Sequence, residues 1–391
     1  TIPEEALDKL SRGMYVMLRE GTCSHDLANL SPMLLENPAR ARRCCFATDD
    51  RAPSDALATG MIDNACRVAI EAGIDPVVAI SMASLSTAEA FGLDHGCRDP
   101  HELRGAIAPG KRADLLVLND LTFATAPHRV YAAGALVAQD GTFVGEIAPE
   151  MAEVAALADE LRASVKLPKL SLDVFDYAFK PGEAVIDVIP GMAITGMARP
   201  ESAEGLRRIM LIERHGRGVS LQAEGADGDG PAGLGLVGKH IGRGWVRGFT
   251  ITGGAIASTI GHDSHNVCVV GDNAADMMAA VEAVGQGGHV LVRNGEVVAR
   301  IPLALGGLMS EGTAEDVAAQ HDDFMVKARA MGIAARPHHG HHFPAPAGNP
   351  DAPHPPRGHV RRHDLHLRRL VIGDVLKRLA VGVACRLTPR P

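Results

Sequence analysis

The sequence predicts an α/β protein, and three observations support this fold class. Its 391 residues are 46% hydrophobic and 22% charged, which suits a chain with buried cores. Over residues 1–92, short apolar runs alternate with amphipathic helical segments, and this alternation indicates a parallel sheet covered by helices. A short β segment and a second α/β region follow, so we expect two or three domains.

The first region begins with a helix over 1–12, where Thr1 and Glu4 have the spacing of a capping box. Two continuous apolar runs that end in polar residues predict buried parallel strands at 14–18 and 44–48. Apolar spacing predicts further helices at 26–35, 55–72 and 76–91, and Pro76 lies in the first turn of the last of these.

The later regions differ from the first. Turn residues separate short strands at 115–118, 130–133 and 136–138, and Gln-Asp-Gly-Thr at 139–142 is a hairpin signal. A connecting helix is expected at 150–167. From about 170 to 330, a second α/β region is predicted, with a helix at 273–284 capped by Asp272 or Asn273. Its strands are expected at 184–189, 209–213, 267–271, 290–293 and 296–301, and the Gly-rich residues 216–248 predict a flexible insertion.

Composition excludes several classes of protein. No window approaches 18 unbroken apolar residues, and no secretory leader is visible. We therefore expect a cytoplasmic protein that does not bind a membrane. The net charge of −8 argues against nucleic-acid binding. Seven scattered cysteines without a Cys-x-x-Cys pair predict buried thiols rather than a zinc module or disulfides. The oligomeric state stays open, and a homo-oligomer is one alternative.

Polar residues at the predicted strand ends are the first candidate site. Glu20 follows one strand, and Asp49 and Asp50 follow the next. In a (β/α) barrel, residues just past the C-terminal ends of the strands face the active site. A carboxylate there could bind a divalent metal or move a proton, and the alternative is a helix N-cap or a turn aspartate.

Two polar motifs in the second region are further candidates. His262, Asp263, His265 and Asn266 precede a strand, and two imidazoles three residues apart could bind a metal or a purine-like ligand. The alternative is a polar loop that satisfies its own backbone. At another strand end, residues 213–215 (Glu-Arg-His) offer Arg214 and His215, where the arginine could bind a ligand or form an ordinary salt bridge.

At these positions the chain resembles bacterial adenine deaminases, a branch of the amidohydrolase superfamily. Four shared motifs lie in the first part of the chain: Gly-Met-Tyr-Val-Met-Leu-Arg-Glu-Gly at 13–21, Phe-Ala-Thr-Asp-Asp-Arg at 46–51, and the segments 60–63 and 105–114. Four lie in the second part: Ile-Glu-Arg-His at 212–215, the segment 254–259, His-Asp-Ser-His-Asn at 262–266, and Pro-Leu-Ala-Leu-Gly-Gly-Leu-Met-Ser at 302–310. The last four are particular to adenine deaminases. The resemblance runs in family order from residue 1 to about 333.

The resemblance implies hydrolytic deamination of adenine to hypoxanthine and ammonia, a reaction of purine salvage. It implies two divalent metal ions, Mn, Fe or Zn, at the mouth of a (β/α)₈ barrel, where a metal-activated hydroxide attacks the purine. By position, Asp49 would be the metal-bound, proton-transferring aspartate, and Asp50 the second choice. The resemblance assigns Glu20 and Arg51 to orienting a ligand. It assigns substrate binding or lid closure to Arg214, His215, His262, Asp263, His265 and Asn266.

The chain departs from the family pattern at its beginning. The other metal ligands of the family, a His-x-His pair, a bridging Glu and two further His, have no counterpart here. We therefore expect the C-terminal portion of such an enzyme, which could be inactive alone. We expect four parts. Residues 1–104 form the end of the barrel, and residues 105–150 form a small β-sandwich portion. Residues 151–333 form the C-terminal domain, and residues 334–391 are an aberrant tail.

The tail has a different composition from the rest. Nine Arg and one Lys against three Asp give residues 331–391 a charge of +7, whereas the preceding 330 residues carry −15. A family-like Asp-Val-Thr-Thr-Phe-Thr-Phe-Val in GC-rich codons, translated two bases later, gives Arg-His-Asp-Leu-His-Leu-Arg, the sequence of 362–368. This predicts a frameshift near 333–340 and a disordered tail, so the His-rich residues 338–342 would not be a selected metal site.

Two other functions stay open from the sequence. A different amidohydrolase could act on another cyclic amidine or amide, but the motifs at 212–215 and 262–266 argue against it. Alternatively, the chain is a non-catalytic fragment without a complete metal site. Deaminase activity and bound metal would distinguish these hypotheses.

Overall fold

A computed structural model describes residues 2–22, 25–49, 51–95, 102–146, 152–162, 164–188, 195–216, 235–236, 241–261 and 265–333. The chain forms two compact units, Thr1–Ala155 and Ala156–Pro391. No helix within the described ranges is long and apolar enough to cross a membrane. Several sequence predictions fall outside these ranges, namely those for Thr1, Asp50, His262, Asp263 and the tail from 334 to 391.

The first unit begins with the predicted alternation of helices and parallel strands. Its elements are α1 (Pro3–Ser11), β1 (Val16–Arg19), α2 (Asp26–Glu36), the 3₁₀ helix η1 (Pro38–Arg43) and β2 (Cys44–Ala47). Strands β1 and β2 pair in parallel, with Val16 opposite Cys44 and Arg19 opposite Ala47. The N-cap of α1 is Ile2, whose side chain makes no cap hydrogen bond, and the capping-box prediction for Thr1 lies outside the described residues.

The two long helices predicted at 55–72 and 76–91 are each divided into two shorter ones. The four helices are α3 (Pro53–Thr59), α4 (Ile62–Glu71), α5 (Pro76–Ala83) and α6 (Leu85–Ala90). Gly60 ends α3 with a φ of +90°, a conformation that glycine adopts easily. Ser84, at φ −120° and ψ −80°, separates α5 from α6. Pro76 opens α5 as predicted, after Asp75, whose side chain accepts from the backbone N–H groups of Val77 and Val78.

A four-stranded antiparallel sheet completes this unit. It runs in the order β3 (Leu115–Val117), β4 (Arg129–Ala132), β5 (Ala135–Gln139) and β6 (Thr142–Phe143). The predicted hairpin turn joins β5 to β6, where Asp140 and Gly141 have φ values of +50° and +79°. Two successive positive φ values are the requirement of a type I′ turn, which explains the Asp-Gly pair.

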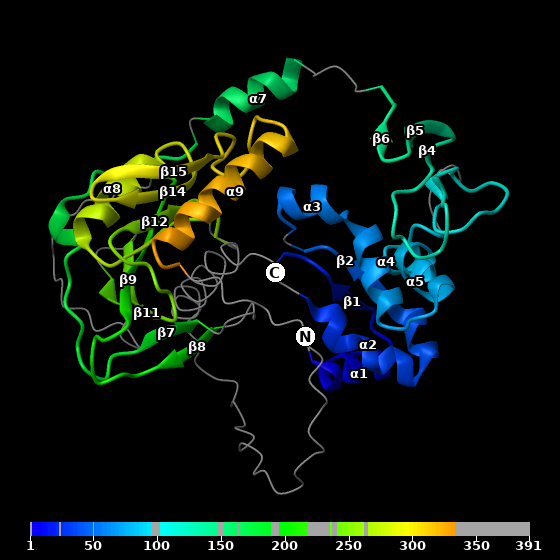
Figure 1. The fold of residues 1–391 in the computed structure, drawn as a ribbon, viewed down its shortest axis with the longest axis horizontal. Coiled ribbons are helices and arrows are strands. Elements are labelled where there is room, and N and C mark those ends of the chain that lie inside the picture. The colour runs from blue at the N-terminus through cyan, green and yellow to red at the C-terminus, as the bar shows by residue number, and fades with distance from the viewer. Residues whose placement is uncertain are drawn as a thin grey trace, which may run out of the picture. The chain divides into compact units, whose positions relative to one another are not determined.

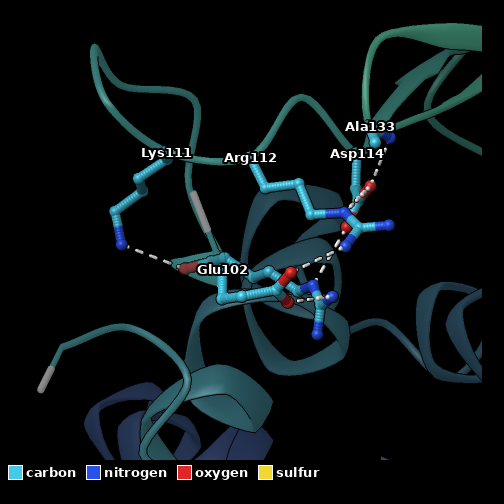
Figure 2. A network of polar contacts seen from close by, with 6 residues as sticks. Glu102, Lys111, Arg112, Asp114 and Ala133 are labelled. Carbon is cyan, nitrogen blue, oxygen red and sulfur yellow. Dashed lines mark hydrogen bonds and ion pairs between the residues drawn. The ribbon is translucent and has the colours of Figure 1, made fainter. Parts of the chain in front are cut away.

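Charged side chains fix the segment that leads into this sheet (Figure 2). Arg104 Nε and Arg112 Nε both donate to the Asp114 carboxylate, at 3.1 and 3.0 Å, and both guanidinium groups also bind Glu102. Asp114 also accepts from the backbone N–H of Ala133 at 2.8 Å. Burial raises the pKa of Asp114, but the Ala133 bond and the two guanidinium groups outweigh it, so that its pKa is lowered. The network therefore ties the start of β3 to the end of β4.

The second unit is built on one mixed sheet (Figure 1). In its described part, the strands run in the order β15 (Glu296–Pro302), β14 (Gly288–Arg293), β12 (Ala255–Ser258), β13 (Val267–Gly271), β9 (Leu206–Ile212), β11 (Ile241–Arg247), β7 (Val185–Val188) and β8 (Thr195–Ala198), with β10 (Gly235–Leu236) beside β11. Only the β11–β7 pair among these is parallel. The helix α7 (Ala152–Arg162) and the 3₁₀ helix η3 (Leu172–Val174) precede the sheet.

Helices cover both faces of this sheet. Alternate residues of β9 point to opposite faces, so Met210 and Ile212 pack in the core beneath α8 (Ala274–Val284). Ile209 and Leu211 pack in the other core, beneath α9 (Ala314–Ala330). Asn273 caps α8, as predicted, and accepts from the Asp276 N–H. The central strands are therefore apolar on both sides.

Several elements of the second unit escape the sequence prediction. Strands β8 and β12 and helix α9 are not predicted, and β11 lies within the segment predicted as a flexible insertion. The glycines Gly242 and Gly244 hide the strand character of β11. Its Ile241 and Val246 are nevertheless fully buried, because the strand hydrogen-bonds to β9 on one side and to β7 on the other.

The described cysteines are free and buried, as the sequence predicts: Cys44, Cys45, Cys66 and Cys268. Burial raises the pKa of Cys268, in β13, to about 12. Below pH 9 both the folded and the unfolded chain keep this proton. Above pH 9 the unfolded chain releases it more readily, so the free energy of unfolding falls until the pH approaches 12.

We predict a measurable contribution of Cys268 to this pH dependence. Between pH 8 and pH 10, the free energy of unfolding of the native chain should fall by about 1.4 kcal/mol more than that of Cys268→Ala. Urea unfolding at both pH values measures the difference. Cavity formation in the variant lowers stability equally at both pH values, so it does not enter the comparison. Equal slopes for the two proteins would contradict the prediction.

Candidate functional site

The ends of β1 and β2 place Glu20 and Asp49, two of the three carboxylates predicted for the first unit, at one edge. Because the two strands are parallel, Glu20 and Asp49 follow them at the same edge. The Glu20 N–H donates to the carbonyl of Ala47 at 2.8 Å, which continues the strand pairing by one residue. The N-cap of α3 is Ala52, so the helix-cap alternative does not hold for Asp49.

Asp49 is held by an arginine from the neighbouring strand. Arg19 donates from Nη1 to Asp49 Oδ2 at 2.7 Å and from Nε to Asp26 Oδ2 at 2.6 Å. Asp26 is buried, and Asp49 has a φ of +51°, an uncommon conformation for a residue other than glycine. Burial lowers the pKa of Arg19, but its bonds to the two carboxylates outweigh it, and the pKa is raised.

Glu20 and Arg51 lie beside this ion-pair network. Glu20 is only 4% exposed, and its Oε1 lies 2.8 Å from His25 Nδ1, which donates to the carboxylate. Arg51 donates to the carbonyls of Gly60 at 2.6 Å and Glu20 at 3.3 Å. Arg51 therefore joins the edge of the strands to the end of α3, and its role in orienting a ligand stays a prediction.

Sequence reasoning missed three residues of this site: Arg19, His25 and Asp26. Arg19 is adjacent to Glu20 in the motif at 13–21, and Asp26 begins α2. The sequence does hold one signal for this site, namely a basic residue at the end of one predicted strand and an acidic residue at the end of the next predicted strand. Without the parallel pairing, however, the partner of Arg19 cannot be identified.

The described residues do not form a metal site by themselves. Within the described ranges, no group of three or more His, Cys, Asp or Glu side chains could hold a metal ion. Asp49 offers one carboxylate, and that carboxylate binds Arg19. The residues that the structure describes therefore do not fit a complete metal centre.

In the second unit, strand pairing brings four sequence motifs to one edge of the sheet. Ile212 at the end of β9 lies opposite Val267 at the start of β13, and Ser258 at the end of β12 lies opposite Cys268. Gly288 at the start of β14 lies opposite Pro302 at the end of β15. Each of four motifs therefore begins or ends at this edge, namely those at 212–215, 254–259, 262–266 and 302–310.

Arg214 is the buried centre of this edge. Its side chain is among the buried polar groups, and Nη1 donates to the carbonyl of Thr259 at 3.2 Å while Nη2 donates to that of Gly306. Within the described residues neither bond involves a carboxylate, so the salt-bridge alternative does not hold there. Burial lowers the pKa of Arg214.

His265 is bonded to Gly261 at the same edge of the sheet. The His265 N–H donates to the carbonyl of Gly261 at 2.8 Å, and His265 Nδ1 accepts from the Gly261 N–H at 3.4 Å. This assignment leaves the ring proton on Nε2. His265 has a φ of +49°, and Asn266 follows it directly before β13. The His215 N–H donates to Glu213 Oε1 at 2.7 Å, so the turn 213–215 caps itself.

Comparison with known protein families matches both units. Residues 15–145 match the amidohydrolase family, and residues 237–353 match the adenine deaminase C-terminal domain. The second match continues 20 residues beyond residue 333, into the segment predicted to be out of frame, so the position of the frameshift stays a prediction.

Curated relatives agree with these matches. An adenine deaminase of Nitratidesulfovibrio vulgaris is 40% identical over 326 residues, which are 81% of this chain and 51% of that protein. The adenine deaminases of Gluconobacter oxydans and Bacillus velezensis are 38% and 37% identical, over 85% and 81% of this chain and 54% and 51% of their own. The chain thus spans about half the length of these relatives.

Among solved structures, an enamidase described as a member of the amidohydrolase superfamily is 21% identical. The likeness covers 37% of this chain and 39% of the enamidase, with a TM-score of 0.27. It is too small to support an argument about fold or function.

We predict that Arg19 stabilises the first unit through its two ion pairs. Arg19→Met should lower the free energy of unfolding by about 2 kcal/mol, because it leaves the buried Asp26 carboxylate without its cation. Urea unfolding measures this loss. Arg12→Met is the matched control, since Arg12 binds Asp8 on the exposed end of α1 and should contribute little. Equal losses in the two variants would contradict the prediction.

Proposed function

Because this chain is related to adenine deaminases across both of its compact units, we propose that the protein catalyses the hydrolytic deamination of adenine to hypoxanthine and ammonia. The observation that carries this proposal is the order of two matches in one chain, an amidohydrolase segment at 15–145 followed by an adenine deaminase C-terminal domain at 237–353. An amidohydrolase segment alone would leave the substrate open.

Asp49 is the proposed proton-transferring residue. In the reaction, water adds to the purine carbon that bears the amino group, and that amino group leaves as ammonia. A carboxylate that accepts a proton from the water and delivers it to the leaving nitrogen serves both steps. The position of Asp49 after a parallel strand supports this role, and Arg19 fixes the direction of its carboxylate at 2.7 Å.

A divalent metal is implied by the relation to amidohydrolases. We propose Mn, Fe or Zn, which carboxylate and imidazole ligands accept, and two ions in an intact site. Asp49 is the residue of this chain proposed to bind one of them. Since the described residues do not complete a metal site, this part of the proposal rests on the family relation alone.

The edge of the second unit is the proposed purine-binding part. Imidazole and amide groups can donate to and accept from the ring nitrogens of adenine. His265 and Asn266 lie at this edge, and the His265 N–H donates to the carbonyl of Gly261. We assign His262, Asp263 and His215 to the same function as predictions from the sequence.

The first prediction concerns activity and metal content. Supplied with Mn, Fe or Zn, the protein should convert adenine to hypoxanthine, followed by ultraviolet absorbance, and Asp49→Asn should lower kcat by at least about 100-fold. Asp75→Asn is the control, because asparagine also caps α5. Elemental analysis measures bound metal.

The outcomes separate the alternatives. No activity and no bound metal would contradict catalysis by this chain and support a non-catalytic fragment. Activity on another cyclic amidine but not on adenine would support a different amidohydrolase. Full activity of Asp49→Asn would contradict the proposed role of Asp49.

The second prediction concerns His265. In a protein with deaminase activity, His265→Ala should raise KM or lower kcat by about 10-fold, because one hydrogen-bonding group to the purine is lost. His128→Ala serves as the control, since His128 lies in the first unit and its imidazole binds Asp140 on the exposed hairpin. Steady-state kinetics over a range of adenine concentrations give both constants. Unchanged constants for His265→Ala would reject the assignment.

A further inference from the structure

One buried carboxylate joins helix α8 to the hairpin between β14 and β15. The helix packs against both strands of this hairpin (Figure 1). Asp276, in the first turn of α8, is only 3% exposed. Its Oδ1 accepts from the Gly295 N–H at 2.6 Å, and its Oδ2 accepts from the Asn294 N–H at 3.3 Å and from Asn273 Nδ2 at 2.8 Å. These bonds compensate the buried charge, and two of them hold the turn of the hairpin.

The turn presents its backbone donors to Asp276. Arg293 pairs with Glu296 across the hairpin. The two residues between them, Asn294 and Gly295, have φ values of +53° and +78°. Two successive positive φ values are typical of a type I′ turn, for which Asn-Gly is a preferred pair. Successive N–H groups in a turn form a concave site for an anion, and here the Asp276 carboxylate occupies it.

The same pair is chemically reactive, because glycine has no side chain to shield its nitrogen. The glycine nitrogen loses its proton and attacks the side-chain carbonyl carbon of the asparagine, and the amide group leaves with a proton as ammonia. Water then opens the resulting succinimide ring at either carbonyl group and gives aspartate or isoaspartate. The net reaction consumes water and releases ammonia. Asn294–Gly295 is the only Asn-Gly pair in the sequence.

Asp276 opposes the first step of this reaction. The attack needs the Gly295 nitrogen as an anion, and a negative carboxylate 2.6 Å away makes that anion less stable. The nitrogen must also turn towards the Asn294 side chain, which breaks its bond to Asp276. Crowding does not protect the pair, since a Cβ atom on Gly295 would meet no other atom within 4 Å.

We propose that Asn294 is a deamidation site that the folded protein keeps unreacted, and that Asp276 is the group responsible. The reaction then proceeds when the hairpin separates from α8. Its product places a second carboxylate beside Asp276, and isoaspartate also adds a methylene group to the backbone of the turn. Both changes disfavour the return of the hairpin to α8. This inference is independent of the proposed function.

Peptide mass spectrometry after incubation in mildly alkaline buffer tests the role of Asp276. Trypsin cleaves after Arg293 and Arg300, so residues 294–300 form one peptide with a single asparagine. Conversion in the folded native chain should be at least about 10-fold slower than in the same chain in guanidinium chloride. In folded Asp276→Ala it should be at least about 10-fold faster than in the folded native chain, because a hydrogen bond to a charged group is lost. A protein isoaspartyl methyltransferase counts the isoaspartate formed.

Val281→Ala is the matched control, because Val281 lies in the core beneath the same helix. This change lowers stability but leaves the bonds of Asp276 in place, so conversion should stay close to the native rate. An equal acceleration in Val281→Ala and Asp276→Ala would assign the effect to lost stability and overturn the inference. A native rate in folded Asp276→Ala would overturn it too.

A second hairpin keeps the test decisive if Asp276→Ala does not fold. Asp140 and Gly141 form the two-residue turn between β5 and β6, with φ values of +50° and +79°. Within the described ranges, no carboxylate accepts from the Gly141 N–H. In folded Asp140→Asn, the pair at 140–141 should therefore convert at least about 10-fold faster than Asn294 in the same molecule. Equally slow conversion of both pairs would show that the turn conformation alone protects them, and would contradict the role of Asp276.

Discussion

The antiparallel pairing of β12, β13 and β9 is the constraint on which the second unit depends. Once Ser258 lies opposite Cys268 and Ile212 lies opposite Val267, the chain segments that leave these strands must emerge at one edge. Hydrogen bonds between neighbouring strands thus do more than stabilise the sheet. They bring motifs separated by about 100 residues into contact, and Arg214 can then bridge two of them.

The two units compensate a buried or half-buried arginine in different ways. Arg19 binds the carboxylates of Asp26 and Asp49, so its charge is balanced within the network. Arg214 binds carbonyl dipoles, which compensate a cation only in part. The first arrangement orients the Asp49 carboxylate, which we propose transfers protons. The second joins the backbone of the segments that follow β12 and β15.

The relation to adenine deaminases gives these arrangements a functional meaning. An amidohydrolase segment supplies carboxylates at the ends of parallel strands, which is where such folds carry out their chemistry. The C-terminal domain supplies a second polar edge, rich in hydrogen-bonding groups and held by the bonds of Arg214 to two segments. Under the proposed function, chemistry would belong to the first unit and substrate recognition to the second.

The sequence by itself determined the parallel strands at 14–18 and 44–48, the hairpin at 139–142, the cap of α8 and the positions of Glu20 and Asp49 at strand ends. These features depend on neighbours along the chain, such as a continuous apolar run or an Asp-Gly pair. Only the tertiary structure decided the division at Gly60 and Ser84, the strand at Ile241–Arg247 and the partners of Arg19 and Arg214. Those outcomes depend on which groups lie opposite after folding. The Gly-rich segment forms a strand because it is buried between two other strands. The role of a buried arginine depends on whether a carboxylate or a carbonyl group lies within hydrogen-bond distance after folding.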